Sequence, residues 1–377
     1  MLEFARSEPF TLGVEVELQI VDPTTYDLSP KAPQLLSRWS GRKTVQPEIF
    51  QSMIELNTGI CADAEAADRD LRSTAEPLMA LAREQGVRFI ATGTHPTARY
   101  TERLIYPAER YHGLIARNQW IARRLQIFGL HVHLGMPDPE TCIAVQNELL
   151  HDLGLLLACS TSSPYFQGEE TGLASSRITV FEGMPTGGMP QPVRDWAEFT
   201  SVVETLTRAH AITSLKDLWW DIRPSPRYGT LEIRVCDGLA TLSETAMIVA
   251  LSQGLARRAG ARVAAGRGRT YPPIWYVREN KWRASRHGMD AEMIVSAEGE
   301  TMPARERLRT TLDELESGGF LAGNERFVPA LRALASGAPT SAERQKATYE
   351  RTRDFHAVTK ALADEFEDDV FAGVGAH

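Results

Sequence analysis

Apolar and polar residues alternate in Thr11-Leu12-Gly13-Val14-Glu15-Val16-Glu17-Leu18-Gln19-Ile20. A period of two over β-branched residues predicts a strand. Because successive side chains of a strand point to opposite faces, Glu15 and Glu17 are expected to share one face. Two carboxylates this close raise each other's pKa unless a cation compensates them. The polar face is therefore either a solvated surface or a cation site, and this stretch alone favours neither.

Length and composition are typical of a soluble globular protein. The chain has 377 residues, 43% of them hydrophobic, and a net charge of -8, which argues against nonspecific binding to nucleic acid or anionic membranes. Cys61, Cys142, Cys159 and Cys236 form no C-x-x-C pair, which argues against a zinc site or disulfide framework and favours a reducing cytosol. No signal peptide or bilayer-spanning run is found. We expect a cytoplasmic protein with no nucleic-acid or membrane partner.

Further elements are expected along the chain. Strands are predicted near residues 52–57, 87–91, 130–135, 218–224 and 229–237, the last two as a hairpin. Helices are predicted at 63–86, 107–128, 138–159, 195–210 and 243–264. The segment at 163–190 is rich in Gly, Ser and Pro and is predicted to be a functional loop. This order predicts an α+β fold with helices on one side of a mainly antiparallel sheet. We expect one catalytic domain over residues 1–377, with a core at about 10–295 and a helical segment at about 300–365.

The expected polar faces carry two kinds of side chain. The carboxylates and imidazoles are Glu15, Glu17, Glu48, Glu55, His131, His133 and Glu232, and the arginines are Arg177, Arg223 and Arg234. Carboxylates with an imidazole suit Mg²⁺ or Mn²⁺, whereas arginines suit phosphate or carboxylate. Together they are the groups that phosphoryl transfer needs. Each also has an ordinary explanation, since a single strand glutamate is usually solvated and two strand histidines can simply be packed.

The sequence motifs of common nucleotide-binding loops and of zinc metalloproteases are absent from the sequence. It contains no G-x-x-x-x-G-K-[ST], no G-x-G-x-x-G and no H-E-x-x-H. A site for ATP would therefore have to be built from sheet carboxylates and metal ions.

Several segments, taken in order, resemble those of one family. They are Gly13-Val14-Glu15-Val16-Glu17, Ser52-Met53-Ile54-Glu55, His131-Val132-His133, Gln167-Gly168-Glu169-Glu170-Thr171-Gly172, Thr230-Leu231-Glu232-Ile233-Arg234 and Glu279-Asn280-Lys281-Trp282-Arg283-Ala284-Ser285-Arg286-His287-Gly288. This order is similar to the bacterial branch of the glutamate–cysteine ligase type 2 family, whose members are ATP-dependent carboxylate–amine ligases. The resemblance spans about residues 10–295. It departs from the family pattern in the loop after Gly168, where an aspartate before Thr171 and an aromatic residue after Ser175 are expected.

The resemblance implies a glutamine synthetase-like fold, in which a curved antiparallel sheet forms a funnel for ATP, Mg²⁺ (or Mn²⁺) and substrates. It implies metal ligands at Glu15, Glu17, Glu48, Glu55, Glu232 and one or both of His131 and His133. Arg234 and Glu232 would be catalytic, with Arg177 and Arg223 as further anion contacts. The cofactor-binding residues would be Arg234, Asn280, Lys281, Trp282 and Arg286, of which Asn280, Trp282 and Arg286 line the substrate end.

The implied reaction joins the γ-carboxylate of glutamate to cysteine or another amine through an acyl phosphate, with weak glutamate–cysteine ligase activity. Closure of the loop from Pro164 to Pro190 would exclude water. No cysteine of the protein is required, and a homodimer is implied. Three alternatives remain: phosphoryl transfer to a guanidino or amino group, metal-dependent hydrolysis without ATP, and a nucleotide-binding regulator without catalysis.

Overall fold

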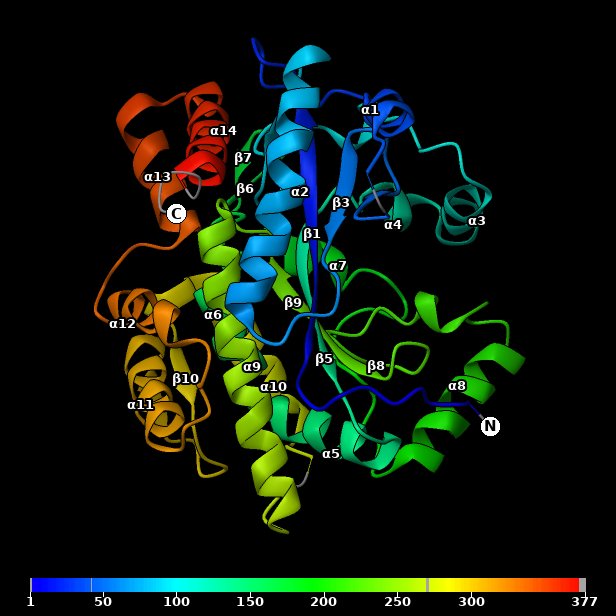
Figure 1. Ribbon diagram of the computed structural model, residues 1–377, viewed down its shortest axis with the longest axis vertical. Helices are drawn as coiled ribbons and strands as arrows, with labels where there is room; N and C mark the ends of the chain where they lie inside the picture. The colour runs from blue at the N-terminus through cyan, green and yellow to red at the C-terminus, as the bar shows by residue number, and fades with distance from the viewer. Residues whose placement is uncertain (1, 42, 269–270, 373–377) are drawn as a thin grey trace.

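The centre of the protein is a seven-stranded sheet (Figure 1). A computed structural model describes residues 2–41, 43–268 and 271–372. The sheet contains β1 (Leu12–Val21), β2 (Val45–Pro47), β3 (Met53–Asn57), β4 (Arg88–Ile90), β5 (Gly129–Gly135), β8 (Ile222–Ser225) and β9 (Thr230–Asp237). Its order is β2-β3-β1-β5-β9-β8, with β4 also beside β1, and its strand pairs are antiparallel. The predicted strands and hairpin are therefore present, although the strand predicted at 218–224 begins only at Ile222.

One face of the sheet is the hydrophobic core. Val14, Val16 and Leu18 of β1 are each 1% exposed, and α2 (Ala64–Glu84) and α9 (Leu242–Ala264) lie across this side of the sheet in Figure 1. Helix α2 begins as predicted, because Oδ1 of Asp63 accepts a hydrogen bond from the Ala66 N–H at 2.8 Å. Because helices cover the apolar face of β1, the polar side chains of β1 lie on the opposite face of the sheet.

Two helices that the periodicity predicted as continuous are each broken. The helix expected at 107–128 is α3 (Glu109–Asn118) and α4 (Trp120–Arg123), separated by Gln119 with a φ of +50°. The helix expected at 138–159 is α5 (Pro139–Leu149) and α6 (Leu153–Cys159), which meet at a bend of 65°. Across the described ranges, no single helix is both long and apolar enough to cross a membrane, and only this bent pair reaches that length and composition when taken together.

The segment at 163–190 is more regular than its composition predicted. It contains β6 (Tyr165–Phe166), β7 (Glu169–Glu170) and α7 (Ser176–Phe181). The buried carboxylate of Asp237 accepts hydrogen bonds from Oγ of Ser163 at 2.7 Å and Oγ of Ser175 at 2.8 Å. Farther along, the Gly188 N–H donates to the Trp219 carbonyl at 3.0 Å. The segment is therefore fixed to the sheet region near both of its ends.

The remaining helices complete the outer layer. They are α1 (Ala32–Arg38), α8 (Trp196–Arg208), α10 (Ile274–His287), α11 (Ala304–Ser317), α12 (Val328–Ala335), α13 (Ser341–Thr352) and α14 (Phe355–Ala372), with the hairpin β10 (Glu292–Ile294) and β11 (Thr301–Pro303) and 3-10 turns at Tyr100–Glu102, Leu215–Asp217, Gly288–Asp290 and Glu325–Phe327. Helices α11 to α14, orange to red in Figure 1, lie beside α9.

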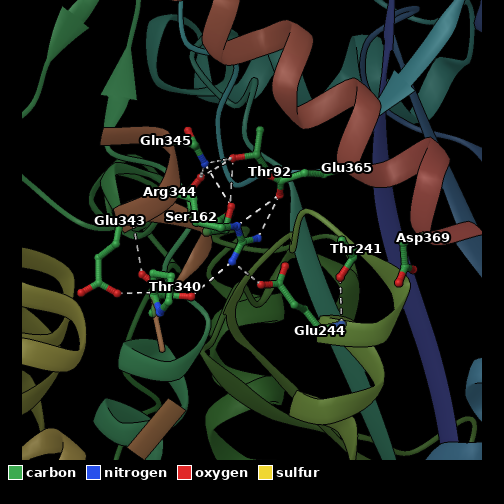
Figure 2. Close-up of polar contacts among 12 residues, drawn as sticks. Thr92, Ser162, Thr241, Glu244, Thr340, Glu343, Arg344, Gln345, Glu365 and Asp369 are labelled. Atoms are coloured by element: carbon green, nitrogen blue, oxygen red, sulfur yellow. Dashed lines mark hydrogen bonds and ion pairs between the residues drawn. The ribbon is translucent and has the colours of Figure 1, made fainter. Parts of the chain in front are cut away.

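Polar side chains join α13 to the core. Figure 2 shows Gln345 pointing toward Thr92 and Ser162. Its Nε2 donates to Oγ1 of Thr92 at 3.1 Å and to the Ser162 carbonyl at 2.8 Å. The next residue toward the N-terminus, Arg344, pairs with glutamates on α9 and α14. The C-terminal helices are thus fixed by buried hydrogen bonds as well as by apolar packing.

Replacing Gln345 by leucine is expected to lower the free energy of unfolding by about 1–3 kcal/mol, because buried acceptors would lose their donor. Urea unfolding followed by circular dichroism measures the change. The control is Arg351→Ala on the exposed side of the same helix, which should change stability by less than about 0.5 kcal/mol. Equal effects of the two substitutions would contradict the anchoring role of Gln345.

Candidate functional site

Cross-strand pairing brings the predicted polar residues onto one face of the sheet. Side chains of directly paired residues in antiparallel strands point to the same side. The register pairs Glu17 with Glu55, Glu15 with His131, His133 with Glu232, and Glu232 with Arg223. The face opposite the core is therefore a continuous layer of carboxylates, imidazoles and arginines across five strands.

Three groups of these side chains could each hold a cation. In each group one ligand atom per residue lies within 4.8 Å of the others. The groups are Glu17, Glu48 and Glu55; Glu15, Glu55 and His131; and Glu15, His133 and Glu232. Since Glu15 and Glu55 each belong to two groups, the arrangement suits neighbouring cations that share carboxylates. Oxygen donors dominate the set, as Mg²⁺ and Mn²⁺ prefer.

The first group has too little positive charge around it. Burial, followed by the charge of Glu17, raises the pKa of Glu48 to about 7. Burial and the neighbouring carboxylates raise the pKa of Glu55 well above its ordinary value. The pKa of Glu17 is also raised by burial, although Arg177 and a hydrogen bond from the Gly129 N–H oppose the shift. A divalent cation would supply the missing charge, so these residues fit a metal.

The two histidines differ electrostatically. Burial and the charge of Arg234 lower the pKa of His131 to about 4, so its imidazole is neutral at pH 7, as a metal ligand must be. The pKa of His133 is raised, because Glu232 and Glu15 outweigh the effect of burial. Both rings contact Glu15, through Nδ1 of His131 at 3.1 Å and Nε2 of His133 at 3.3 Å. Each histidine is therefore placed to share a cation with Glu15.

Glu232 lies between two arginines. Nη2 of Arg223 is 2.6 Å from its Oε2, and Nη1 of Arg234 pairs with its Oε1. Burial alone would raise the pKa of Glu232, but Arg223 and Arg234 hold it far below its ordinary value. The carboxylate therefore stays charged and keeps both guanidinium groups in fixed positions.

The three predicted anion-binding arginines are not equivalent. Arg223 is occupied, since its Nη1 also donates to the carbonyls of Leu215 and Leu218. Arg177 is 2% exposed, and its Nη groups face backbone carbonyls. All three arginines have a buried Nε without a hydrogen-bond partner among the described residues. Both Nη groups of Arg177 and Arg223 are bonded, whereas within the same residues Arg234 uses only Nη1, which donates to Glu232. The charges of Glu232, and after it Glu15 and Glu17, raise the pKa of Arg234. Arg234 is thus the arginine best placed to meet an anion beside the cation groups.

Comparison with known proteins decides the family. A model of glutamate-cysteine ligase family 2 matches residues 11–361. The chain belongs to this family. A relative from Bdellovibrio bacteriovorus is 45% identical over 98% of both chains, and one from Gloeobacter violaceus is 39% identical over 96% of this chain and 98% of that one; the names of both assign them provisionally as glutamate–cysteine ligase 2.

A solved structure shares the fold of this protein. It is the glutamate–cysteine ligase of Francisella tularensis in complex with AMP, with a TM-score of 0.72 at 11% identity, covering 99% of this chain and 90% of that chain. The prediction of a glutamine synthetase-like α+β fold and of a ligase that forms C–N bonds is confirmed.

The residues predicted to bind cofactor from α10 separate into two groups. Lys281 and Trp282 line a cavity of about 390 Å³ between α7, residues 187–189 and α10, where Nζ of Lys281 lies 2.7 Å from Glu182 and 2.5 Å from Asp221. Asn280 does not line it. Both ends of the Asn280 amide bond the backbone of Ile294, at 2.8 and 2.7 Å, so this side chain joins α10 to β10.

Arg286, the fourth predicted residue of α10, also has a structural contact. Its Nη1 donates to the Gly172 carbonyl. It therefore ties α10 to the segment at 163–190 rather than to the cavity residues. Of the four, only Trp282 both lines the cavity and is exposed, because the Nζ of Lys281 is buried and already paired with Glu182 and Asp221.

Two residues of the site were not predicted from the sequence. Gly129 fell between the helix predicted at 107–128 and the strand predicted at 130–135, yet it begins β5, donates its N–H to Glu17 at 2.5 Å and leaves space that Arg177 fills. Glu182 follows α7 and pairs with Lys281. A glycine directly before a His-x-His strand was the available signal for Gly129, whereas Glu182 had none because its partner is about a hundred residues away.

Proposed function

We propose that the protein is an ATP-dependent carboxylate–amine ligase that activates the γ-carboxylate of glutamate and joins it to an amine, cysteine being the first candidate. The observation that carries the proposal is the position of Arg234 beside three cation-binding groups on one sheet face, with only its Nη1 hydrogen-bonded, to Glu232, among the described residues. This combination suits a polyphosphate better than an isolated carboxylate or arginine does. The proposal includes small-molecule substrates, a cytoplasmic location and a homodimer, as expected from the sequence.

The residues that would hold Mg²⁺, or Mn²⁺, are those of the three groups: Glu15, Glu17, Glu48, Glu55, His131, His133 and Glu232. When bound, the metal would neutralise charge on the ATP phosphates. The raised pKa values of Glu48 and Glu55 support this role, because they reflect a need for positive charge.

The chain's own residues would act by position and charge. A γ-carboxylate oxygen of glutamate attacks the γ-phosphorus of ATP, the bond to the bridging oxygen breaks, and ADP leaves with an acyl phosphate remaining. Arg234 would stabilise the transferred phosphoryl group, and Glu232 with Arg223 would keep Arg234 in place. The amine then attacks the acyl carbon, phosphate departs, the amine loses a proton and an amide forms.

The decisive experiment measures ADP release with Mg²⁺, ATP and glutamate across a panel of amines that includes cysteine, with mass spectrometry of the products. The proposal expects amine-dependent ADP release and a γ-glutamyl amide. ADP release with glutamate alone would indicate an acyl phosphate whose amine is missing from the panel. A phosphorylated amine without amide would favour a kinase. Turnover without ATP would favour a hydrolase, and ATP binding without any turnover would favour a regulator.

Iodoacetamide is expected to leave glutamate-dependent ADP formation unchanged, because this mechanism needs no protein thiol. All four cysteines are free and buried, and burial raises the pKa of Cys236 to about 12, which keeps the thiol protonated. Intact-protein mass spectrometry should show little labelling of the folded protein and four labels after denaturation. Loss of activity in proportion to labelling of the folded protein would contradict the expectation.

A further inference from the structure

We infer that Arg177 is a positioning residue for the proposed reaction: it holds the backbone from which Arg234 reaches the cation groups. This inference rests on the proposed function, and it replaces the expectation that Arg177 contacts a substrate anion. The argument depends on an irregularity in β9, on what Arg177 contacts, and on the space that Gly129 leaves.

Strand β9 carries a bulge at Arg234. The pairing between β5 and β9 joins Leu130 to Cys236 but Val132 to Ile233, so one extra residue of β9 lies opposite His131. A bulge bends its strand and redirects a side chain. Here the backbone N–H of Arg234 donates at 2.7 Å to the Asp221 carbonyl, which fixes one side of the bulge.

Arg177 fixes the other side of the bulge. Its Nη2 donates to the Arg234 carbonyl at 3.2 Å, and its Nη1 makes a longer contact, 3.5 Å, with the Val235 carbonyl. These carbonyls lie where the regular ladder is interrupted, and a buried carbonyl needs a donor. A guanidinium that is almost fully buried and turned toward backbone oxygens cannot reach a substrate without leaving the bulge.

The surroundings of Arg177 are shaped to keep it there. A Cβ on Gly129 would overlap Nη2 of Arg177, so the guanidinium lies in the space that this glycine leaves open. At the other end of the residue, the Arg177 N–H donates at 3.1 Å to Oγ of Ser163, which in turn donates to Asp237 at 2.7 Å. Both the backbone and the side chain of Arg177 are therefore fixed, and so is the bulge it supports.

A kinetic double-mutant cycle tests the inference. Arg177→Met should lower kcat for glutamate-dependent ADP formation by about 100-fold, the effect of displacing a catalytic group by about 1 Å. KM for ATP and for glutamate should change by less than about threefold, because no ligand contact is lost. In an Arg234→Met background the same substitution should have almost no further effect. Arg177→Lys should lose nearly as much as Arg177→Met, since lysine keeps the charge but not the paired donors.

Two kinetic results would overturn the inference. One is an equal loss of kcat from Arg177→Met with and without Arg234, which would mean that the two residues act independently. The other is a raised KM with unchanged kcat, which would mean that Arg177 binds a substrate directly.

A stability cycle tests the same geometry without turnover. Gly129→Ala should lower Tm in the wild type, where the methyl group meets Arg177, but should leave Tm nearly unchanged in Arg177→Met, where the space is empty. Equal Tm shifts in both backgrounds would overturn the inference even if Arg177→Met alone were poorly folded. A wild-type protein that forms no ADP would refute the proposed function, whereas this cycle would still report on Arg177.

Discussion

Glu232→Gln is expected to reduce glutamate-dependent ADP formation by about 10³-fold, the scale of losing a preorganised charged group at a phosphoryl-transfer site. The substitution keeps nearly the same shape but removes the charge that holds Arg223 and Arg234. It also removes one oxygen donor from the group formed with Glu15 and His133. Coupled-enzyme detection of ADP measures the rate, and circular dichroism checks the fold.

Glu298→Gln is the matched control, since Glu298 is an exposed glutamate in none of the cation groups. It should keep the wild-type rate. A folded Glu232→Gln variant that still forms ADP at the wild-type rate would show that this carboxylate neither binds metal nor aligns Arg234. In that case the roles of both residues in the proposed reaction would have to be abandoned.

The polar face could be predicted from the sequence because strand alternation is a local signal. Alternation in β1 placed Glu15 and Glu17 together, and the same rule applied to His131 and His133. Local alternation does not predict the register, that is, which residues of neighbouring strands are paired. Pairing Glu15 with His131, rather than with a residue one position away, depends on where each strand lies in the sheet.

Other features depend on contacts distant in sequence. The breaks at Gln119 and between α5 and α6 interrupt helices whose apolar periodicity continues through them, so the folded core overrides the pattern. The residues alone gave Arg177, Arg223 and Arg234 the same anion-binding chemistry, and only the family resemblance singled out Arg234. Their difference appears only when the remaining donors are counted: both Nη groups of Arg177 and of Arg223 are bonded to carbonyls or to Glu232, whereas among the described residues Arg234 uses only Nη1, on Glu232. Residue type predicts the chemistry available, whereas the remaining hydrogen-bond capacity decides which residue can use it.

Mg²⁺ binding is expected to weaken by roughly tenfold for each pH unit below about pH 7, because a proton on the carboxylate competes with the metal. The group responsible is Glu48, whose pKa burial and Glu17 raise to about 7. The direction in which pH changes the stability of the protein follows from the same raised pKa. Without metal, the folded protein binds more protons than the unfolded chain between the ordinary and the raised pKa, so stability falls as pH rises through this window. Differential scanning fluorimetry in EDTA and in Mg²⁺, at about pH 5.5 and about pH 7.5, measures both effects.

Glu48→Gln separates this carboxylate from other groups whose pKa is raised, such as His133 beside Glu232 and Glu15. In EDTA at about pH 7.5 the variant should have a higher Tm than the wild type, because one charge is removed from the repulsion among Glu17, Glu48 and Glu55. In Mg²⁺ it should gain less Tm than the wild type, because one ligand is lost. A smaller Mg²⁺-dependent gain in Tm than in the wild type identifies a metal ligand, since a purely structural glutamate would shift Tm equally in both conditions. A Tm that does not change on addition of Mg²⁺ at any pH tested would refute the cation site at Glu17, Glu48 and Glu55.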